Sequence, residues 1–174
     1  LAHTFGMDFY PAQGWNMGFT LQDGELTNSE GGNVDRRAVS VSGGRTSPDT
    51  DWQSKLEWRQ DTGVEQREQW VSTNRFTHKI NESWRVAARF NYADTQDDLN
   101  AAAGARFIEG NVGFAWRPWN STRWGVFGRY TYLYDLSTLG QVGGANYDQK
   151  SRILSLEGVY KYDQHWEFAA KVAQ

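Results

Sequence analysis

Apolar and polar residues alternate along most of this chain, as in the segment INESWRVAARFNY at 80–92. Trp84 and Phe90 mark its apolar positions, while Arg85 and Arg89 lie between them. A period of two predicts a β-strand with one apolar face and one polar face. In a soluble sheet the apolar face would cover a core, whereas in a membrane barrel it would face lipid and the polar face would line the lumen.

The same alternation predicts ten strands, joined in turn by short turns and by long polar connections. Their length suits the ~9–11 residues that a tilted strand needs to cross a bilayer. The long connections are rich in Gly, Asn, Asp, Thr and Gln. The predicted strands are 3–11, 15–25, 35–45, 51–60, 67–80, 83–93, 105–118, 123–135, 149–162 and 165–173. We therefore expect an all-β, antiparallel, up-and-down transmembrane β-barrel fold.

A tryptophan follows each short turn and sets the phase of the strand after it. Placing these tryptophans toward lipid puts them at one membrane interface, where indole rings are favoured. The predicted aromatic girdle comprises Trp15, Trp52, Trp84, Trp124 and Trp166. Charged residues are nearly absent from this phase, with Arg37 as the exception. The fifth strand fits least well, because Asn74 and His78 share the phase of its apolar residues, and a bulge or register slip would explain it.

The opposite phase collects charged residues that we expect to line the lumen. With Asp8 and Glu167 included, ten basic and four acidic residues give this face a charge of +6. Such a lumen would favour anions, although Arg and Glu on neighbouring strands could instead pair and fill a narrow interior. The predicted lumen-lining charges are Lys55, Glu57, Arg59, Arg75, Lys79, Arg85, Arg89, Arg117, Arg129, Glu157, Lys161 and Lys171.

Composition narrows the class of protein. The chain has 174 residues, 15% of them aromatic and none of them cysteine, and its mean hydropathy is −0.74. No apolar run approaches the ~20 residues of a membrane helix. The net charge of −3 gives no indication of nucleic-acid binding. A soluble propeller or sandwich is the alternative, but a propeller would place four short strands, rather than two long ones, in the tryptophan period of 32 to 42 residues.

Catalytic and metal-binding signals are weak. The three histidines, His3, His78 and His165, are predicted to lie too far apart to meet, and no Gly-x-Ser-x-Gly elbow is present. We expect no enzymatic activity, no cofactor and no metal site. The acidic run DTQDD at 94–98 has carboxylates that calcium could use, but it lacks the spacing of a defined loop and reads more simply as a solvated acidic connection.

The predicted topology places both chain ends on the side of the long connections, which in outer-membrane barrels is extracellular. A complete barrel would normally begin and end in the periplasm. We therefore expect residues 1–174 to form a single barrel segment that is incomplete at both ends, within a barrel of twelve or more strands.

Three segments carry a resemblance to a known group of proteins: TNRFTHKINESWRVAARFNY, GFAWRPWNSTRWGVFGRYTYLYDL and KSRILSLEGVYKYDQHWEFAAKVA, within residues 70–174. They resemble the carboxy-terminal β-barrel of large, repeat-containing, porin-like or OmpA-like proteobacterial outer-membrane proteins. The resemblance implies a Gram-negative outer-membrane location, with the lipid bilayer and lipopolysaccharide as surroundings. Other domains or chains would complete or plug the barrel.

Two functions are consistent with these expectations. One is a channel or translocation pore with a net basic lumen. The alternative is a non-conducting membrane anchor, or an assembly platform for extracellular or periplasmic domains or for partner chains. A conductance measurement would separate them.

Overall fold

The computed structural model describes residues 1–27, 31–97, 104–136 and 148–174. In these residues the chain forms one antiparallel sheet of ten strands and contains no helix. The strands are β1 (Ala2–Phe9), β2 (Trp15–Thr27), β3 (Asn33–Thr46), β4 (Thr50–Gly63), β5 (Arg67–Lys79), β6 (Trp84–Asp97), β7 (Ala105–Trp116), β8 (Trp124–Leu136), β9 (Asp148–Lys161) and β10 (Glu167–Ala173). The ten predicted strands are confirmed.

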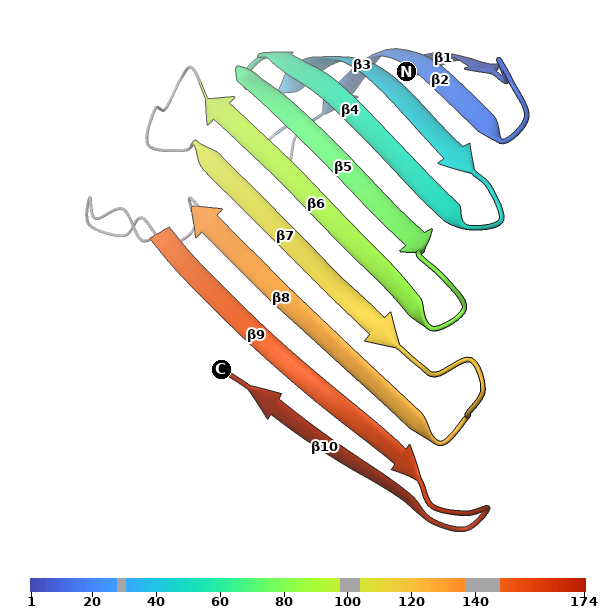
Figure 1. The fold of residues 1–174 in the computed structure, drawn as a ribbon. Coiled ribbons are helices and arrows are strands. Elements are labelled where there is room, and N and C mark those ends of the chain that lie inside the picture. Colours follow the sequence, from blue (N-terminus) through green and yellow to red (C-terminus); the bar gives the residue numbers. More distant parts are fainter. Residues whose placement is uncertain (28–30, 98–103, 137–147) are drawn as a thin grey trace.

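The strand order in the sheet is the order in the chain, so every strand pairs with its sequence neighbours (Figure 1). Strands β1 and β10 each have one partner, and no pairing joins them in the described residues. The up-and-down meander is thus as predicted, and the observed sheet is open. Within the described part of the chain, no helix is long and apolar enough to cross a membrane.

Several strands extend further toward the long connections than predicted. Strand β4 reaches Gly63 and β6 reaches Asp97, because their terminal residues still pair with neighbours: Asp61 with Arg36 and Asp97 with Arg67. Opposite charges directly across an antiparallel pair stabilise it. The sheet therefore continues into sequence whose polarity had indicated a loop.

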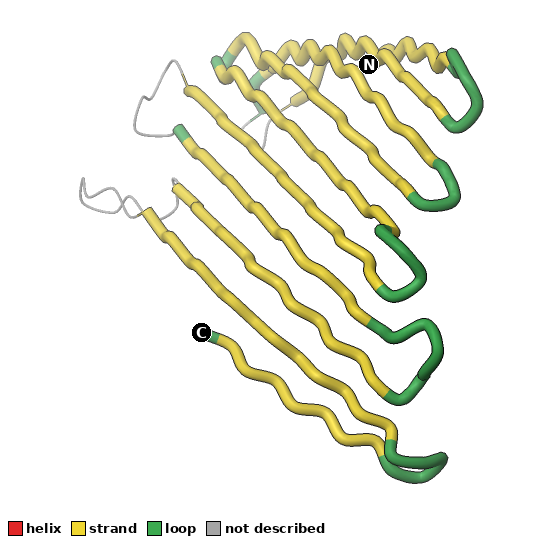
Figure 2. Tube along the Cα trace, in the orientation of Figure 1, coloured by secondary structure: helices red, strands yellow, loops and turns green. Residues whose placement is uncertain are grey.

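The short turns lie along one edge of the sheet, and the strand ends that flank the long connections lie along the other (Figure 2). The turn before β2 requires a glycine, since Gly14 has a φ of 77° and a Cβ there would collide with the carbonyl oxygen of Thr46. The Gly14 carbonyl accepts a hydrogen bond from the Thr46 backbone N–H at 2.7 Å. This turn fixes the register between β2 and β3 at Trp15 and Arg45.

The pairing register sorts the strand residues onto two faces without interruption. We call the face that contains Trp15, Trp52, Phe76, Phe90 and Phe114 the apolar face. The face that contains Gln53, Arg75, Arg89, Asn111 and Thr131 is the polar face.

The sheet curls around its polar face. Apart from the glycines, the buried residues in the described part of the chain are Val34, Ala38, Ser40 and Asp61, and all four belong to the polar face of β3 and β4. In a single layer of strands, a side chain can be enclosed only on the concave side. Figures 1 and 2 show β1 to β3 turning away from the direction of the later strands. The apolar face is therefore the convex, outer surface.

Strand β5 has neither a bulge nor a register slip, so that prediction was wrong. Its pairing with β4 and β6 is continuous. Asn74 does lie on the apolar face, where it accepts a hydrogen bond from Ser54 Oγ at 2.6 Å and donates one to Ser72 Oγ at 2.9 Å. His78 Nδ1 lies 2.8 Å from Thr50 Oγ1. These polar groups satisfy one another, so they can lie on this face without breaking the ladder.

Candidate functional site

A cavity of about 870 Å³ lies against the centre of the sheet. Residues from β2 to β8 line it, and five of them are basic: Lys55, Arg75, Arg85, Arg89 and Arg129. No acidic residue lines the cavity. All five basic residues belong to the polar face, and we call them the basic patch. It is the strongest candidate site in the described residues.

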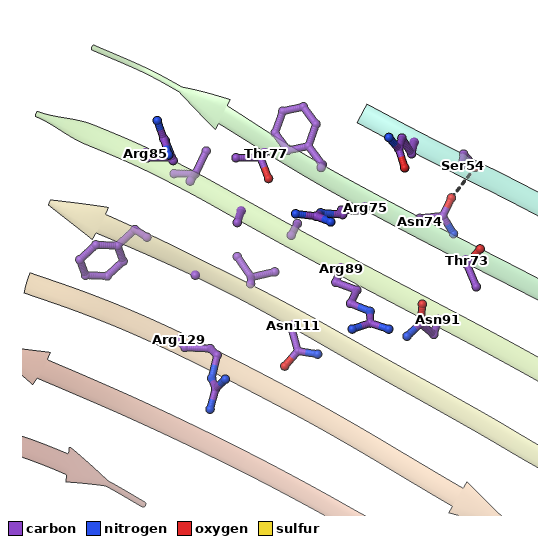
Figure 3. Close-up of a pocket in the computed structure, with 18 of the residues that line it drawn as sticks. Ser54, Thr73, Asn74, Arg75, Thr77, Arg85, Arg89, Asn91, Asn111 and Arg129 are labelled. Carbon is purple, nitrogen blue, oxygen red and sulfur yellow. Dashed lines mark hydrogen bonds between the residues drawn. The ribbon is translucent and has the colours of Figure 1, made fainter. Parts of the chain in front are cut away.

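The register brings like charges together in this patch. Arg75 on β5 is directly opposite Arg89 on β6, a position where Cβ atoms lie about 5 Å apart. Figure 3 shows Arg75, Arg89 and Arg129, from β5, β6 and β8, over one stretch of the sheet. Like charges directly opposite destabilise a strand pair. The facing arginines therefore do not serve strand pairing. They form a positively charged surface that suits an anion.

Three arginines of the patch have no carboxylate within ion-pair distance among the described residues: Arg75, Arg85 and Arg129. Arg89 interacts electrostatically with Glu109, also without a close ion pair. Lys55 differs, since its Nζ is 2.8 Å from Glu57, which also binds Arg59 at 2.7 Å. Guanidinium groups without a fixed partner are available to bind carboxylate or phosphate.

Polar networks border the patch on the side of the long connections. Glu109 accepts hydrogen bonds from Asn91 at 2.8 Å and from Asn111 at 2.9 Å, and Asn111 accepts one from Thr131 at 2.7 Å. On β3 and β4, Arg36 and the buried Asp61 form a two-bond ion pair at 2.7 and 2.8 Å. These contacts fix the side chains around the patch, and sequence reasoning found none of them.

Every predicted lumen-lining charge that lies in a paired strand belongs to the polar face. Those outside the basic patch are Glu57, Arg59, Lys79, Glu157, Lys161 and Lys171. Arg117 is not a paired strand residue, because it follows β7, and its backbone N–H donates to the Ser83 carbonyl. The pairing of Arg and Glu proposed as an alternative occurs in part: Glu57 binds Lys55 and Arg59 within its own strand, and Lys161 lies 3.3 Å from Glu167.

The predicted face charge of +6 was wrong. The paired strand residues of the polar face include eleven basic and nine acidic side chains, a net of two positive charges. The prediction missed residues at the strand ends, among them Arg36, Asp61, Arg67, Asp97 and Asp135. The positive charge is therefore local: it lies at the centre of the face, in the basic patch, and acidic residues balance it toward the edges.

The five predicted girdle tryptophans lie on the turn side of the sheet. Trp15 packs edge-on against Trp52 with ring centroids 6.3 Å apart, Trp84 contacts Trp116, and Trp124 lies 4.3 Å from the ring of Tyr160. Trp166 precedes β10 and is 62% exposed. The five tryptophans thus lie along one edge of the sheet.

Arg37 is not the only charged residue of the apolar face, which corrects that expectation. Near the long connections the register also places there Asp23, Glu25, Asp35, Glu68, Asp94, Arg106, Asp148, Lys150 and Arg152, and near the turns Arg45. Between these two edges the face carries no charged residue in the described strands. If the alternation that starts at each post-turn tryptophan had been followed to the ends of the strands, these charged residues would have been assigned to the apolar face.

The histidines do not form a site. His3 is on β1, His78 on β5 binds Thr50, and His165 is 4.0 Å from Asp163 in the turn before β10. In the acidic run at 94–98, Asp94 binds Arg106 and Asp97 binds Arg67, while Asp98 lies outside the described residues. Among described residues, no group of three metal-ligating side chains occurs.

No protein-family model matches this chain, and no curated protein or solved structure matches it either.

Proposed function

We propose that this chain forms part of the wall of a bacterial outer-membrane β-barrel, with its apolar face against lipid and its polar face along a water-filled lumen that favours anions. The observation that carries the proposal is the pairing of a convex apolar face with a concave basic patch. The proposal has two parts, a membrane location and a transport function, and different observations support each of them.

The near absence of a core supports the membrane location. In the described residues only Val34 and Ala38 are buried apolar residues, while large apolar side chains such as Phe90, Val112 and Leu154 are 46 to 62% exposed. A soluble domain of this length buries most of its apolar surface. Lipid would cover such a face without a second protein layer.

The height of the apolar part of the outer face, measured across the bilayer, also supports the membrane location. On β6, Trp84 near the turns and Tyr92 near the long connections are eight residues apart on the same face. That separation is about 26 Å along a strand, or about 20 Å across the bilayer at a tilt near 40°. The apolar band of outer-membrane barrels, flanked by aromatic girdles, is ~25 Å tall.

The basic patch supports the transport function. Positive rings in a pore lower the electrostatic barrier for anions, and fixed charges are most effective where the solute is held close to them. We therefore name Arg75, Arg85, Arg89 and Arg129 as the groups that act on the solute. Lys55 contributes less, since Glu57 neutralises it at 2.8 Å.

Single-channel recordings in planar bilayers of the closed barrel that contains this chain in its wall test the proposal. We expect a steady conductance with a reversal potential that indicates anion preference at low salt. The double variant R75Q/R89Q should lose much of that preference. Lys161→Gln is the matched control, because it removes a positive charge from the same face at a residue paired with Glu167, outside the cavity lining.

An unchanged permeability ratio in R75Q/R89Q would contradict the role of the patch. No conductance from protein that is folded and inserted would contradict the channel and support the second candidate, a non-conducting membrane anchor or assembly platform. The ion pairs of Glu57 with Lys55 and Arg59 favour that candidate, because they occupy part of the concave face.

A further inference from the structure

Cations and tyrosines alternate across three neighbouring strands on the apolar face, near the long connections. We call Arg106 on β7, Tyr132 and Tyr134 on β8, and Lys150 and Arg152 on β9 the rim cluster. Tyr134 pairs in register with Lys150 and Tyr132 with Arg152. The Lys150 Nζ lies 5.3 Å from the Tyr134 ring centroid, and the Arg152 guanidinium lies 6.0 Å from that of Tyr132.

The cations of the rim cluster lie next to a surface that is otherwise apolar. Leu154, two residues from Arg152 on the same face, is 62% exposed, and Tyr130 beside it is 42% exposed. Arg152 is exposed and has no carboxylate within ion-pair distance among the described residues. Arg106 is 49% exposed and binds Asp94 at 3.2 Å. Arg152 therefore presents a positive charge without a carboxylate partner to whatever covers the apolar face.

The two arginines lie at the same height above the turns. Arg106 is ten residues from Trp116 along β7, and Arg152 is ten residues from Tyr162 along β9 and its end. Ten residues span about 33 Å along a strand, or about 25 Å of depth at a tilt near 40°. This equals the height of the apolar band, so both guanidinium groups would lie at its outer boundary, where lipid headgroups begin.

We propose that the rim cluster binds the phosphorylated headgroup of a membrane lipid, an inference that rests on the proposed membrane location but not on channel activity. Arg152 supplies the guanidinium donors, which match phosphate oxygens in geometry and charge, while Arg106 stays paired with Asp94 at the side of the cluster. The tyrosine hydroxyls between them supply further donors at the interface, where such rings are favoured. The lipid's acyl chains lie along Leu154 and Tyr130.

Other parts of the same face lack this combination. Arg37 on β3 occupies a similar height, eight residues from Arg45, but it binds Asp23 at 3.3 Å, and no tyrosine is adjacent to it in register. Arg45 lies over Trp15 at the turn side of the sheet. Arg37 therefore provides a control for loss of one positive charge from the apolar face.

Lipid binding can be measured by native mass spectrometry of the full chain in detergent, titrated with phosphatidic acid or with phosphatidylcholine. We expect the chain to retain phosphatidic acid in preference to phosphatidylcholine. Arg152→Gln should raise the apparent Kd for phosphatidic acid about tenfold, as expected for loss of one charge-assisted contact. Arg37→Gln should leave it unchanged.

Equal retention of the two lipids, or equal effects of R152Q and R37Q, would overturn the inference. Flotation of the wild-type chain with phosphatidylcholine vesicles keeps this failure separate from failure of the proposed function. A chain that floats but lacks the preference has a membrane location without a headgroup site. A chain that does not float lacks the membrane location, and the inference falls with it.

Discussion

Replacement of Val112 by arginine tests directly whether lipid covers the apolar face. Val112 is in β7, on the apolar face between Ala88 and Tyr130, and it is 60% exposed. Trp116 is four residues away toward the turns. Four residues correspond to about 13 Å along the strand and about 10 Å in depth at a tilt near 40°, which is close to the middle of a ~25 Å band.

The two environments predict different costs for this substitution. In lipid, arginine near the midplane destabilises a barrel by about 2–4 kcal/mol. In water, a substitution at so exposed a position changes stability by about 0.5 kcal/mol or less. Ile108→Arg on the same strand and face lies four residues further from the turns, near the edge of the band, where the cost falls to about 0–1 kcal/mol.

Equilibrium unfolding in denaturant, in the presence of phospholipid vesicles, measures these free energies. Ile153→Arg adds the same charge at a 42% exposed residue of the polar face and should cost little. The expected order of destabilisation is Val112→Arg above Ile108→Arg above Ile153→Arg. Equal values for the three variants, within about 0.5 kcal/mol, would refute a lipid-covered face.

Three further predictions concern single contacts. Asp61→Ala should destabilise the sheet by about 2 kcal/mol in the same unfolding assay, because it removes the two charge-assisted hydrogen bonds of Arg36, whose side chain is 31% exposed. Asp23→Ala, which breaks an exposed pair, should cost under about 1 kcal/mol. Gly14→Ala should cost more than about 1 kcal/mol, since it places a Cβ at φ 77° against Thr46, and an unaltered midpoint would contradict this account of the turn. Arg89→Gln should stabilise the sheet by about 0.5 kcal/mol, because it removes the repulsion with Arg75. The gain should shrink as salt is added. A loss of stability would mean that the two guanidinium groups do not repel each other.

The fold followed from the sequence because its signals are local. A tryptophan after each short turn fixes the phase of the next strand, so Arg85 and Arg89 could be assigned to the face opposite Trp84 without knowledge of any partner strand. Alternation and turn composition then gave ten strands in an antiparallel meander, in which neighbours in sequence are neighbours in space.

The remaining features depend on register, which no single strand reveals. Asn74 looked misplaced because its partner Ser54 is twenty residues away in the sequence and becomes a neighbour only through the pairing of β4 with β5. The conflict between Arg75 and Arg89, and the balance of Arg36 by Asp61, likewise arise from cross-strand positions. The charge count overestimated the positive charge of the polar face because the predicted strands stopped before residues such as Asp61 and Asp97, which pairing includes in the sheet.

The strictly sequential strand order has a consequence for how such a wall can vary. Each hairpin contacts only the hairpins before and after it, so its stability is close to a sum of nearest-neighbour terms, as in a repeat array. A duplicated or deleted hairpin would create one new strand junction and leave every other interface intact. It would change the circumference of a closed ring by two strands, and the diameter grows roughly in proportion to strand number. In the proposed closed barrel, pore width would thus be adjustable in discrete steps by copying a segment of about 35 to 40 residues.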